Sequence, residues 1–217
     1  MTDFSDMLAG YRRFRETGWA QQRGRWNELS EGQSPKVMVI ACSDSRVDPA
    51  QIFDTSPGEI FVVRNVAALV PPFETNPGHH GVSAALEFAV QVLKVSEIVV
   101  MGHGKCGGCR AALSQELKDA TPGEGGFIAN WIEMLDGARE TVVARLGTDQ
   151  GRDAERAMEQ EGVKVSLGNL RTFPCVRQKE RAGELRLIGS FFAISDGQLH
   201  VLDEATGQFS PAASAIG

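Results

Sequence analysis

The chain has 217 residues, of which 42% are hydrophobic and 23% are charged, and this is enough for one sizeable hydrophobic core. Its formal net charge of -6 at pH 7 argues against nucleic acid or an anionic membrane as the main partner. No apolar run approaches the roughly 20 residues that span a bilayer, and the first residues, MTDFSDML, are acidic where a secretory signal would be basic. We therefore expect a cytoplasmic protein with no membrane and no nucleic-acid partner.

Residues 1–34 are predicted to form a helical arm. Apolar residues recur at the three- and four-residue steps of an amphipathic helix, at Phe4, Met7, Leu8, Tyr11 and Phe14. A polar segment from Ser30 to Pro35 separates this helix from the first predicted strand. A single apolar stripe needs a surface to cover, and the pattern leaves open whether that surface belongs to the same domain or to a second subunit.

Residues 35–217 are predicted to form a single α/β domain. Short, nearly continuous apolar runs are typical of parallel strands that are covered on both faces, and they occupy 37–40, 60–63 and 98–101. A helix with one apolar side at 82–93 lies between the last two runs, which implies a right-handed crossover. Further helical patterns follow at 128–146 and again before Pro174. A late pair of strands, at 186–194 and 198–202, is joined at SDGQ. We predict a mostly parallel sheet of four strands plus an antiparallel edge strand, flanked by helices.

Two polar stretches, CSDSR and GHGKC, directly follow predicted strands. Ligands of open α/β sheets bind beyond the carboxyl ends of the strands, so Cys42, His103 and Cys106 are expected at one edge. Reduced cysteines in the cytoplasm point to metal binding or catalysis before disulfides, and the start of a helix at Cys106 favours the thiolate form. Two thiolates and an imidazole suit Zn²⁺, and three protein ligands leave its fourth position open.

Asp44 and Arg46 give this pattern a catalytic interpretation. Zinc with two thiolates is formally neutral and withdraws electrons from bound water less strongly than a site of neutral ligands, so a nearby carboxylate must help to orient that water. Arg46 can grip Asp44 through a charge-assisted bond, which keeps Asp44 ionised and away from the metal. An ionised Asp44 only accepts hydrogen bonds and so selects the protonated oxygen of a zinc hydroxide. The plainer alternative is a surface ion pair.

The other residues also have alternative interpretations. Taken singly, a cysteine after a strand is commonly a small buried residue, and a histidine in a glycine-rich turn is commonly a loop residue. Cys106 and Cys109 form a C-x-x-C at a strand-to-helix turn, as in thioredoxin-like dithiol oxidoreductases, but that role leaves Cys42 and His103 without a shared purpose. A purely structural zinc is a further alternative, although it has no open position for Asp44 to serve.

The motifs CSDSR and GHGKCGG, with GEIFVVRNVA between them, resemble those of the β-class carbonic anhydrases. The resemblance continues through HHGVSAALEFAVQVLKVSEIVVMGH, LRTFP and GSFFAISDGQLHVLD, and so covers most of the chain. It implies one zinc ion on Cys42, His103 and Cys106, with Asp44 and Arg46 beside it. The implied reaction is the reversible hydration of carbon dioxide to bicarbonate and a proton by zinc-bound hydroxide. Hydrolysis of carbon disulfide or carbonyl sulfide is the alternative on the same scaffold.

The resemblance also implies how substrate and subunits are arranged. The smallest functional unit is a homodimer in which the arm embraces the partner, and dimers can pair into tetramers. An apolar cleft for carbon dioxide, completed across the dimer, corresponds to Gln33, Phe61, Val66 and Phe88, and Gly107 matches a backbone donor beside the site.

Some relatives carry a regulatory bicarbonate pocket built from a tryptophan, an arginine and a tyrosine. The matching positions here are Val39, Arg64 and Phe192, so only the arginine remains. We therefore predict the plant-type form, with an open zinc position and without the bicarbonate switch.

Overall fold

The computed structural model describes residues 2–212 of the chain. Contacts between Cα atoms divide the chain into two compact units, Met1–Ser34 and Pro35–Gly217. Among the helices of the described residues, none is both long enough and apolar enough to cross a membrane.

The first unit is helical, as its sequence pattern predicts. It consists of α1 (Phe4–Phe14), the π-helical segment η1 (Arg15–Trp19) and α2 (Arg23–Glu31). A capping box begins α1, because the Asp3 side chain accepts the N–H of Asp6 and the Asp6 side chain accepts the N–H of Asp3. The five apolar residues of the α1 stripe are between 42% and 71% exposed in this chain.

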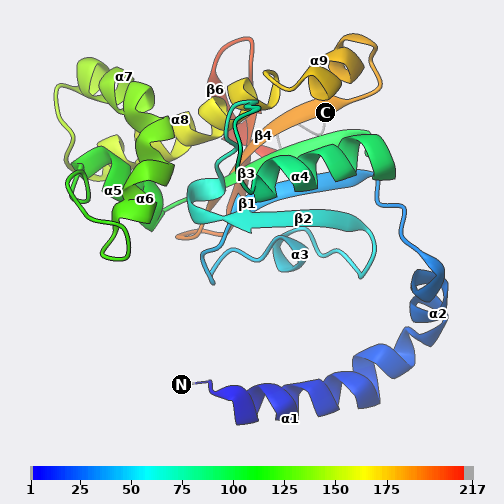
Figure 1. Cartoon of the computed structure of the whole chain (residues 1–217). Helices are drawn as coiled ribbons and strands as arrows, with labels where there is room; N and C mark the ends of the chain where they lie inside the picture. Colours follow the sequence, from blue (N-terminus) through cyan, green and yellow to red (C-terminus); the bar gives the residue numbers. More distant parts are fainter. Residues whose placement is uncertain (1, 213–217) are drawn as a thin grey trace. The chain divides into compact units, whose positions relative to one another are not determined.

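The second unit is built on a six-stranded sheet with the order β2-β1-β3-β4-β5-β6 (Figure 1). The first four strands are parallel, and β5 and β6 are antiparallel to their neighbours. The strands are β1 (Val37–Cys42), β2 (Ile60–Asn65), β3 (Glu97–His103), β4 (Arg186–Ala193), β5 (Gln198–Asp203) and β6 (Gln208–Pro211). The predicted fold class is confirmed, and β6 extends the sheet by a second antiparallel strand.

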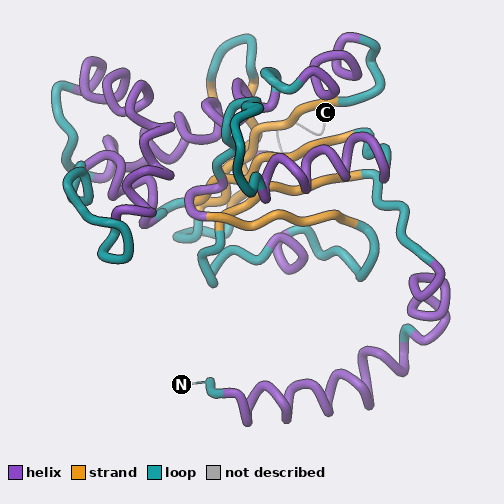
Figure 2. Tube along the Cα trace, in the orientation of Figure 1, coloured by secondary structure: helices purple, strands orange, loops and turns teal. Residues whose placement is uncertain are grey.

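Helices cover both sides of this sheet, with α3 and α4 on opposite sides (Figures 1 and 2). The pattern at 128–146 forms two helices rather than one, separated by a 3-10 turn that carries the fully buried Leu135. The helical elements are α3 (Pro49–Ile52), η2 (Val66–Ala68), α4 (Gly81–Glu87), η3 (Phe88–Leu93), α5 (Gly107–Ser114), α6 (Gly126–Ile132), η4 (Glu133–Leu135), α7 (Asp136–Leu146), α8 (Arg152–Leu170) and α9 (Pro174–Arg181).

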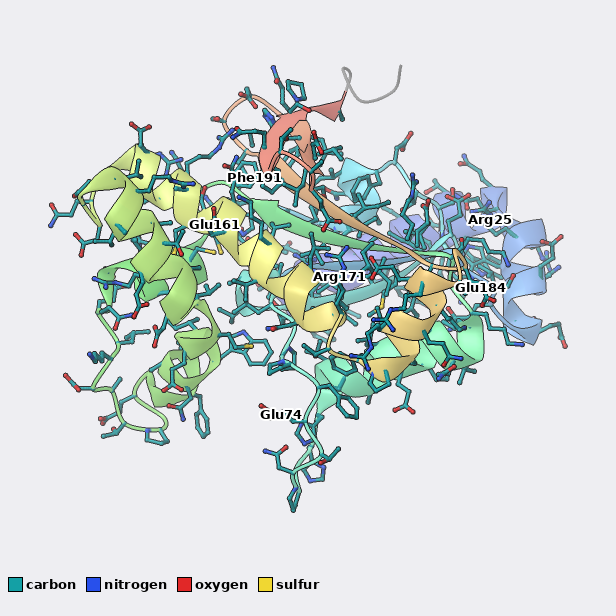
Figure 3. The ribbon with its side chains drawn as sticks, turned by 90° about the horizontal axis from the view of Figure 1, so that it is seen from above. Arg25, Glu74, Glu161, Arg171, Glu184 and Phe191 are labelled. Atoms are coloured by element: carbon teal, nitrogen blue, oxygen red, sulfur yellow. The ribbon has the colours of Figure 1, made fainter. Side chains whose placement is uncertain are left out.

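The longest helix, α8, lies across the sheet, as Figure 3 shows with Glu161 labelled on it and Arg171 just past its end. Val163 and Leu167 of α8 belong to the same buried cluster as Met38 and Ile98 of the sheet. Gly102 in β3 makes this close approach possible, because a Cβ at that position would lie 2.6 Å from Cγ2 of Val163. The packing of α8 on β3 therefore depends on the absence of a side chain at Gly102.

The topology leaves one crevice at the carboxyl edge of the sheet. The chain leaves β1 for β2 on one side, whereas it leaves β3 for β4 on the other side. Such a reversal of strand order opens a binding crevice beyond the strand ends. Here it lies between the ends of β1 and β3, where the two polar motifs of the sequence are found.

Gly102→Ala is predicted to lower the free energy of unfolding by about 1–3 kcal/mol, because the new methyl group would displace Val163 and with it α8. Gly168→Ala is the matched control. It lies on α8, and apart from the neighbouring helix backbone no atom lies within 4 Å of where its Cβ would be. The substitution should therefore be neutral or stabilising by about 0.5–1 kcal/mol. Denaturant unfolding at a saturating zinc concentration measures both changes, and equal midpoints for the two variants would contradict the close-approach explanation.

Candidate metal centre

Three potential ligands meet at the crevice. Cys42 ends β1, His103 ends β3 and Cys106 is the N-cap residue of α5. Since Ala41 pairs with Met101 in the parallel register, the residues that follow them emerge side by side. The three ligand atoms lie within 4.8 Å of one another, and all three residues are buried. The structure thus brings together the three residues that the sequence motifs single out.

The orientation of His103 suits metal binding. Its Nδ1 lies 3.0 Å from the carbonyl oxygen of Gly104, and a carbonyl only accepts, so Nδ1 carries the hydrogen and donates it. This leaves the lone pair on Nε2, which is buried and has no hydrogen-bond partner. Because a buried polar atom is costly without a partner, a cation between His103 and the two cysteines accounts for this arrangement.

The two thiols also call for a cation. The pKa of Cys42 is raised to about 12, first by a hydrogen bond with the Cys106 thiol and then by burial. The pKa of Cys106 is likewise raised to about 12, by a hydrogen bond with Cys109 and by burial. Without a compensating cation, these effects would outweigh the thiolate preference expected at the start of α5. A divalent ion that favours sulfur and imidazole ligands, such as zinc, supplies the charge that two buried thiolates require.

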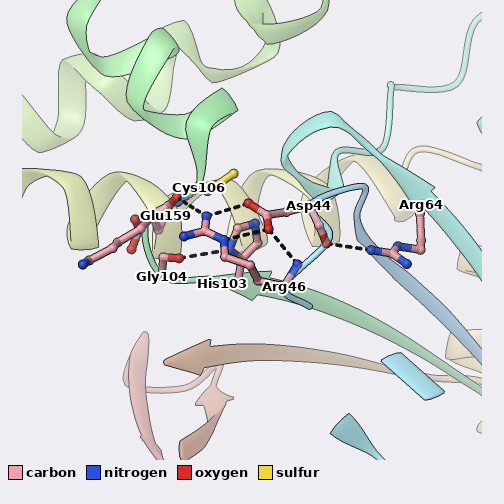
Figure 4. A network of polar contacts seen from close by, with 8 residues as sticks. Asp44, Arg46, Arg64, His103, Gly104, Cys106 and Glu159 are labelled. Carbon is pink, nitrogen blue, oxygen red and sulfur yellow. Dashed lines mark hydrogen bonds and ion pairs between the residues drawn. The ribbon is translucent and has the colours of Figure 1, made fainter. Parts of the chain in front are cut away.

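Asp44 and Arg46 form a two-pronged ion pair beside the cluster (Figure 4). Nε of Arg46 donates to Oδ1 of Asp44 at 2.9 Å, and Nη2 donates to Oδ2 at 2.6 Å. These hydrogen bonds hold the pKa of the Asp44 carboxyl well below its usual range. Nη2 of Arg46 also donates to the carbonyl of Lys105 at 3.0 Å, which ties the loop after β1 to the turn after β3.

Asp44 does not join the potential metal ligands. Within the described residues, the grouped ligand atoms are those of Cys42, His103 and Cys106, with no carboxylate oxygen among them. Both oxygens of Asp44 are instead engaged by Arg46. A metal ion held by these three residues would therefore keep one position open.

Arg64 of β2 fixes the same loop from the other side. Its Nε donates to the carbonyl of Cys42 at 2.9 Å, Nη2 donates to the carbonyl of Asp44 at 2.7 Å, and Nη1 pairs with the Asp48 carboxylate at 2.9 Å. The sequence comparison linked Arg64 only to the regulatory pocket of relatives, so this role was missed. The available signal was an arginine inside the otherwise apolar run of β2, on the strand that pairs with β1.

Glu159 of α8 contacts the backbone of a potential metal ligand, and sequence reasoning missed it. It is 3% exposed, and its Oε1 accepts the backbone N–H of Cys106 at 3.2 Å (Figure 4). Burial raises the pKa of its carboxyl to about 7. The signal in the sequence was one acid on the apolar side of α8, three, four and seven residues before Gly162, Val163 and Ser166.

The predicted cleft residues are only partly brought together. The rings of Phe61 and Phe88 stack with their centroids 5.9 Å apart, and Phe88 is 43% exposed. Val66 lies against the start of α5, where a Cβ on Gly108 would approach its side chain to 2.7 Å, and Gly107 is the first residue of α5. Gln33 belongs to the first unit, and its role in the cleft remains a prediction.

The C-x-x-C alternative does not fit this geometry. Cys106 is shared with the Cys42 and His103 cluster, while Cys109 is buried inside α5, with its sulfur 3.7 Å from the position of a Cβ on Gly162. A dithiol that exchanges electrons with other proteins needs an accessible sulfur. Cys109 is therefore a packed residue of the core.

The chain also matches known proteins. A family model described as carbonic anhydrase matches residues 37–199. A carbonic anhydrase of Pseudomonas aeruginosa is 36% identical over 204 residues, which cover 94% of this chain and 90% of the relative.

Solved structures agree with this match. The β-carbonic anhydrase CcaA superimposes with a TM-score of 0.88 at 29% identity, over 96% of this chain and 91% of that one. The β-carbonic anhydrase of Coccomyxa, solved with acetazolamide, gives a TM-score of 0.80 at 30% identity, over 93% and 87% of the two chains. Together with the Cys–His–Cys cluster, these matches show that the chain belongs to the carbonic anhydrase family and is a β-class enzyme that hydrates carbon dioxide.

Proposed function

We propose that Cys42, His103 and Cys106 hold zinc with one open position, and that Asp44 and Arg46 control what happens there. The observation that carries this proposal is the bidentate ion pair between Arg46 and Asp44, which lies beside the three grouped ligand residues. Bound zinc supplies a Lewis acid that makes water nucleophilic near neutral pH and stabilises developing negative charge. The residues of the chain provide orientation, substrate access and exclusion of bulk water.

Asp44 orients the attacking oxygen. Because Arg46 keeps it ionised, its carboxylate can only accept hydrogen bonds, and it therefore binds an oxygen that carries a hydrogen. That bond directs the hydrogen toward Asp44 and leaves a lone pair free to meet carbon dioxide. Without Arg46, the carboxylate would be free to turn toward the metal and fill the open position.

The substrate cleft is apolar because carbon dioxide is small, linear and nonpolar. Phe61, Val66 and Phe88 would hold it by contact alone, without hydrogen bonds. Gly107 begins α5, and the first N–H groups of a helix have no partner within it. Its N–H is therefore suited to donate a hydrogen bond to the oxygen on which negative charge develops as bicarbonate forms. In the family resemblance the cleft is completed across the dimer, and Gln33 is the polar residue at the matching position.

Asp44→Asn is expected to lower kcat/KM for carbon dioxide hydration by about 10–100-fold while the zinc content stays at about one ion per chain. The amide donates as well as accepts, so it no longer selects the protonated oxygen. Stopped-flow hydration assays and zinc analysis of the same samples provide the measurement.

Asp54→Asn serves as the control, because Asp54 is an exposed carboxylate just past α3 and Asn also tolerates its positive φ of 49°. It should keep the wild-type rate. An Asp44→Asn enzyme that is fully loaded with zinc and fully active would rule out the orienting role.

We also propose the plant-type form without the regulatory bicarbonate pocket. Val39 is fully enclosed in an apolar cluster against which Phe192 packs, so neither offers a donor to an anion. Arg64, the retained arginine, is committed to the loop that carries Cys42 and Asp44. A bicarbonate ion at this place would have to break those bonds and would gain no other donor from these positions.

Added bicarbonate is therefore expected to leave the shape of the pH–rate profile unchanged, apart from product inhibition. The measurement is the initial hydration rate at a series of pH values, with and without bicarbonate at a fixed ionic strength. A profile that becomes steeper, with activity lost at acidic pH in the presence of bicarbonate, would contradict the proposal.

We further propose a homodimer, or a dimer of dimers, in which the arm of one subunit packs on the other. The exposed apolar stripe of α1 supports this arrangement, because Phe4, Met7 and Tyr11 are each more than half exposed. Two β-carbonic anhydrases of Sordaria macrospora are described as tetrameric, and one aligns with a TM-score of 0.79 at 28% identity over 95% of this chain and 98% of that chain.

Free cysteines at the metal centre support a reducing, cytoplasmic location, which cell fractionation would test.

Tyr11→Asp is expected to weaken the dimer by about 30-fold or more in Kd, because it places a charge on the apolar stripe of α1. Arg13→Asp adds a carboxylate on the side of the helix opposite the stripe, and should leave the dimer intact. Sedimentation over a concentration series measures both. The arm has no role in assembly if Tyr11→Asp sediments like the wild type.

A further inference from the structure

Glu159 is a buried carboxylate to which the reaction assigns no role. Among the described residues it is the one Asp or Glu in the buried class. Removing a carboxylate from water is energetically costly unless hydrogen bonds or ion pairs compensate for it. An apolar side chain at this position of α8 would avoid that cost, so the contacts that Glu159 makes deserve a functional explanation.

Its side chain is hydrogen-bonded to the backbone of a metal ligand residue. Oε1 accepts the backbone N–H of Cys106 at 3.2 Å across 53 positions of sequence, while Oε2 is buried without a partner. Cys106 is itself 2% exposed, and the bond to its N–H is buried. The bond joins α8 to the turn that carries both His103 and Cys106 (Figure 4).

The position of Glu159 follows from the fold. Gly102 lets α8 lie against β3, and a Cβ at Gly102 would come within 3.4 Å of the backbone oxygen of Glu159. The end of β3 and the side chain of Glu159 are therefore held together by the same close approach. Arg46 restrains the opposite side of the turn, since it donates to the carbonyl of Lys105 at 3.0 Å. Side chains therefore bind the backbone of the turn at two successive residues. Arg46 donates to the carbonyl of Lys105, and Glu159 accepts from the N–H of Cys106.

We propose that Glu159 is a positioning residue of the metal centre, which fixes the backbone of Cys106 and thereby sets the affinity of the site for zinc. This inference rests on the proposed role of Cys42, His103 and Cys106 as zinc ligands. Groups that orient metal ligands commonly contribute 10–100-fold to metal affinity or activity. The feature that matters is an acceptor at the distance of Oε1, since the bond partner is a neutral N–H group.

Three substitutions separate acceptor, charge and reach. Glu159→Ala removes the acceptor and leaves the buried Cys106 N–H unpaired, so the Kd for zinc should rise by about 10–100-fold. Glu159→Gln keeps a carbonyl oxygen at the same reach and should stay within about threefold of the wild type. Glu159→Asp keeps the charge but shortens the side chain by one carbon, and its affinity should fall with that of Glu159→Ala.

The experiment is a competition between the full-length protein and a chromophoric chelator for zinc, with the absorption spectrum of the cobalt-substituted protein as a second readout. Wild type and Glu159→Gln should share one cobalt spectrum, whereas Glu159→Ala and Glu159→Asp should show a shifted one. Glu155→Ala is the control, because Glu155 lies one turn earlier on α8 and lines the same 160 Å³ cavity behind Cys106. It should bind zinc as the wild type does. Far-UV circular dichroism of the metal-free proteins checks that each variant is folded. If Glu159→Ala does not fold, the zinc affinities of Glu159→Gln and Glu159→Asp are compared instead, and the proposal requires that Glu159→Gln binds more tightly.

Equal zinc affinity in all three Glu159 variants would overturn the proposal, as would an inverted order in which Asp rescues and Gln does not. Cys42→Ser distinguishes this failure from a failure of the proposed function. If Cys42→Ser loses zinc while the Glu159 variants keep it, the zinc ligands stand and only the role of Glu159 falls. If Cys42→Ser binds zinc like the wild type, the ligand assignment itself is wrong, and the inference about Glu159 falls with it.

Discussion

The parallel pairing of β1 with β3 is the constraint on which the site depends. Ala41 and Met101 are partners in this register, so the residues that follow them, Cys42 and Gly102 with His103, leave the sheet side by side. Strand order reverses at this point, and the departing chains separate to leave a crevice. Two segments that are distant in sequence can therefore supply ligands to one ion without any special loop.

Two arginines and one glutamate then hold the segments after the strands. Arg64 binds two carbonyls of the loop after β1, and Arg46 joins that loop to the turn after β3. Glu159 restrains the same turn from α8. Side chains from three places, β2, α8 and the loop after β1, thus restrain the segments that carry the ligands.

Much of this arrangement could be predicted from the sequence, because Cys42, His103 and Cys106 each follow directly on an apolar strand pattern. Asp44 and Arg46 could be paired because they are two residues apart. Periodicity places Glu159 on the apolar side of α8, but whether it faces Cys106 depends on how the helix crosses β3. That crossing is set by Gly102 and Val163, a contact between distant segments that periodicity does not reveal.

Other parts of the chain were hidden from the sequence for different reasons. Strand β6 (Gln208–Pro211) is four residues long and ends in a proline, so it lacks the run of β-branched residues by which longer strands are recognised. The role of Arg64 was obscured because its bonds go to carbonyl oxygens, which every residue has. Side chains that bind backbone are the part of a site for which a sequence offers the least signal.

X-ray absorption at the zinc edge of the purified protein, compared between wild type and Asp44→Asn, tests the central claim most directly. The account predicts two sulfur neighbours at about 2.3 Å and two lighter neighbours at about 2.0–2.1 Å, with the same spectrum in both proteins. Fewer than two sulfur neighbours, or a light-atom shell that changes when Asp44 becomes Asn, would contradict it.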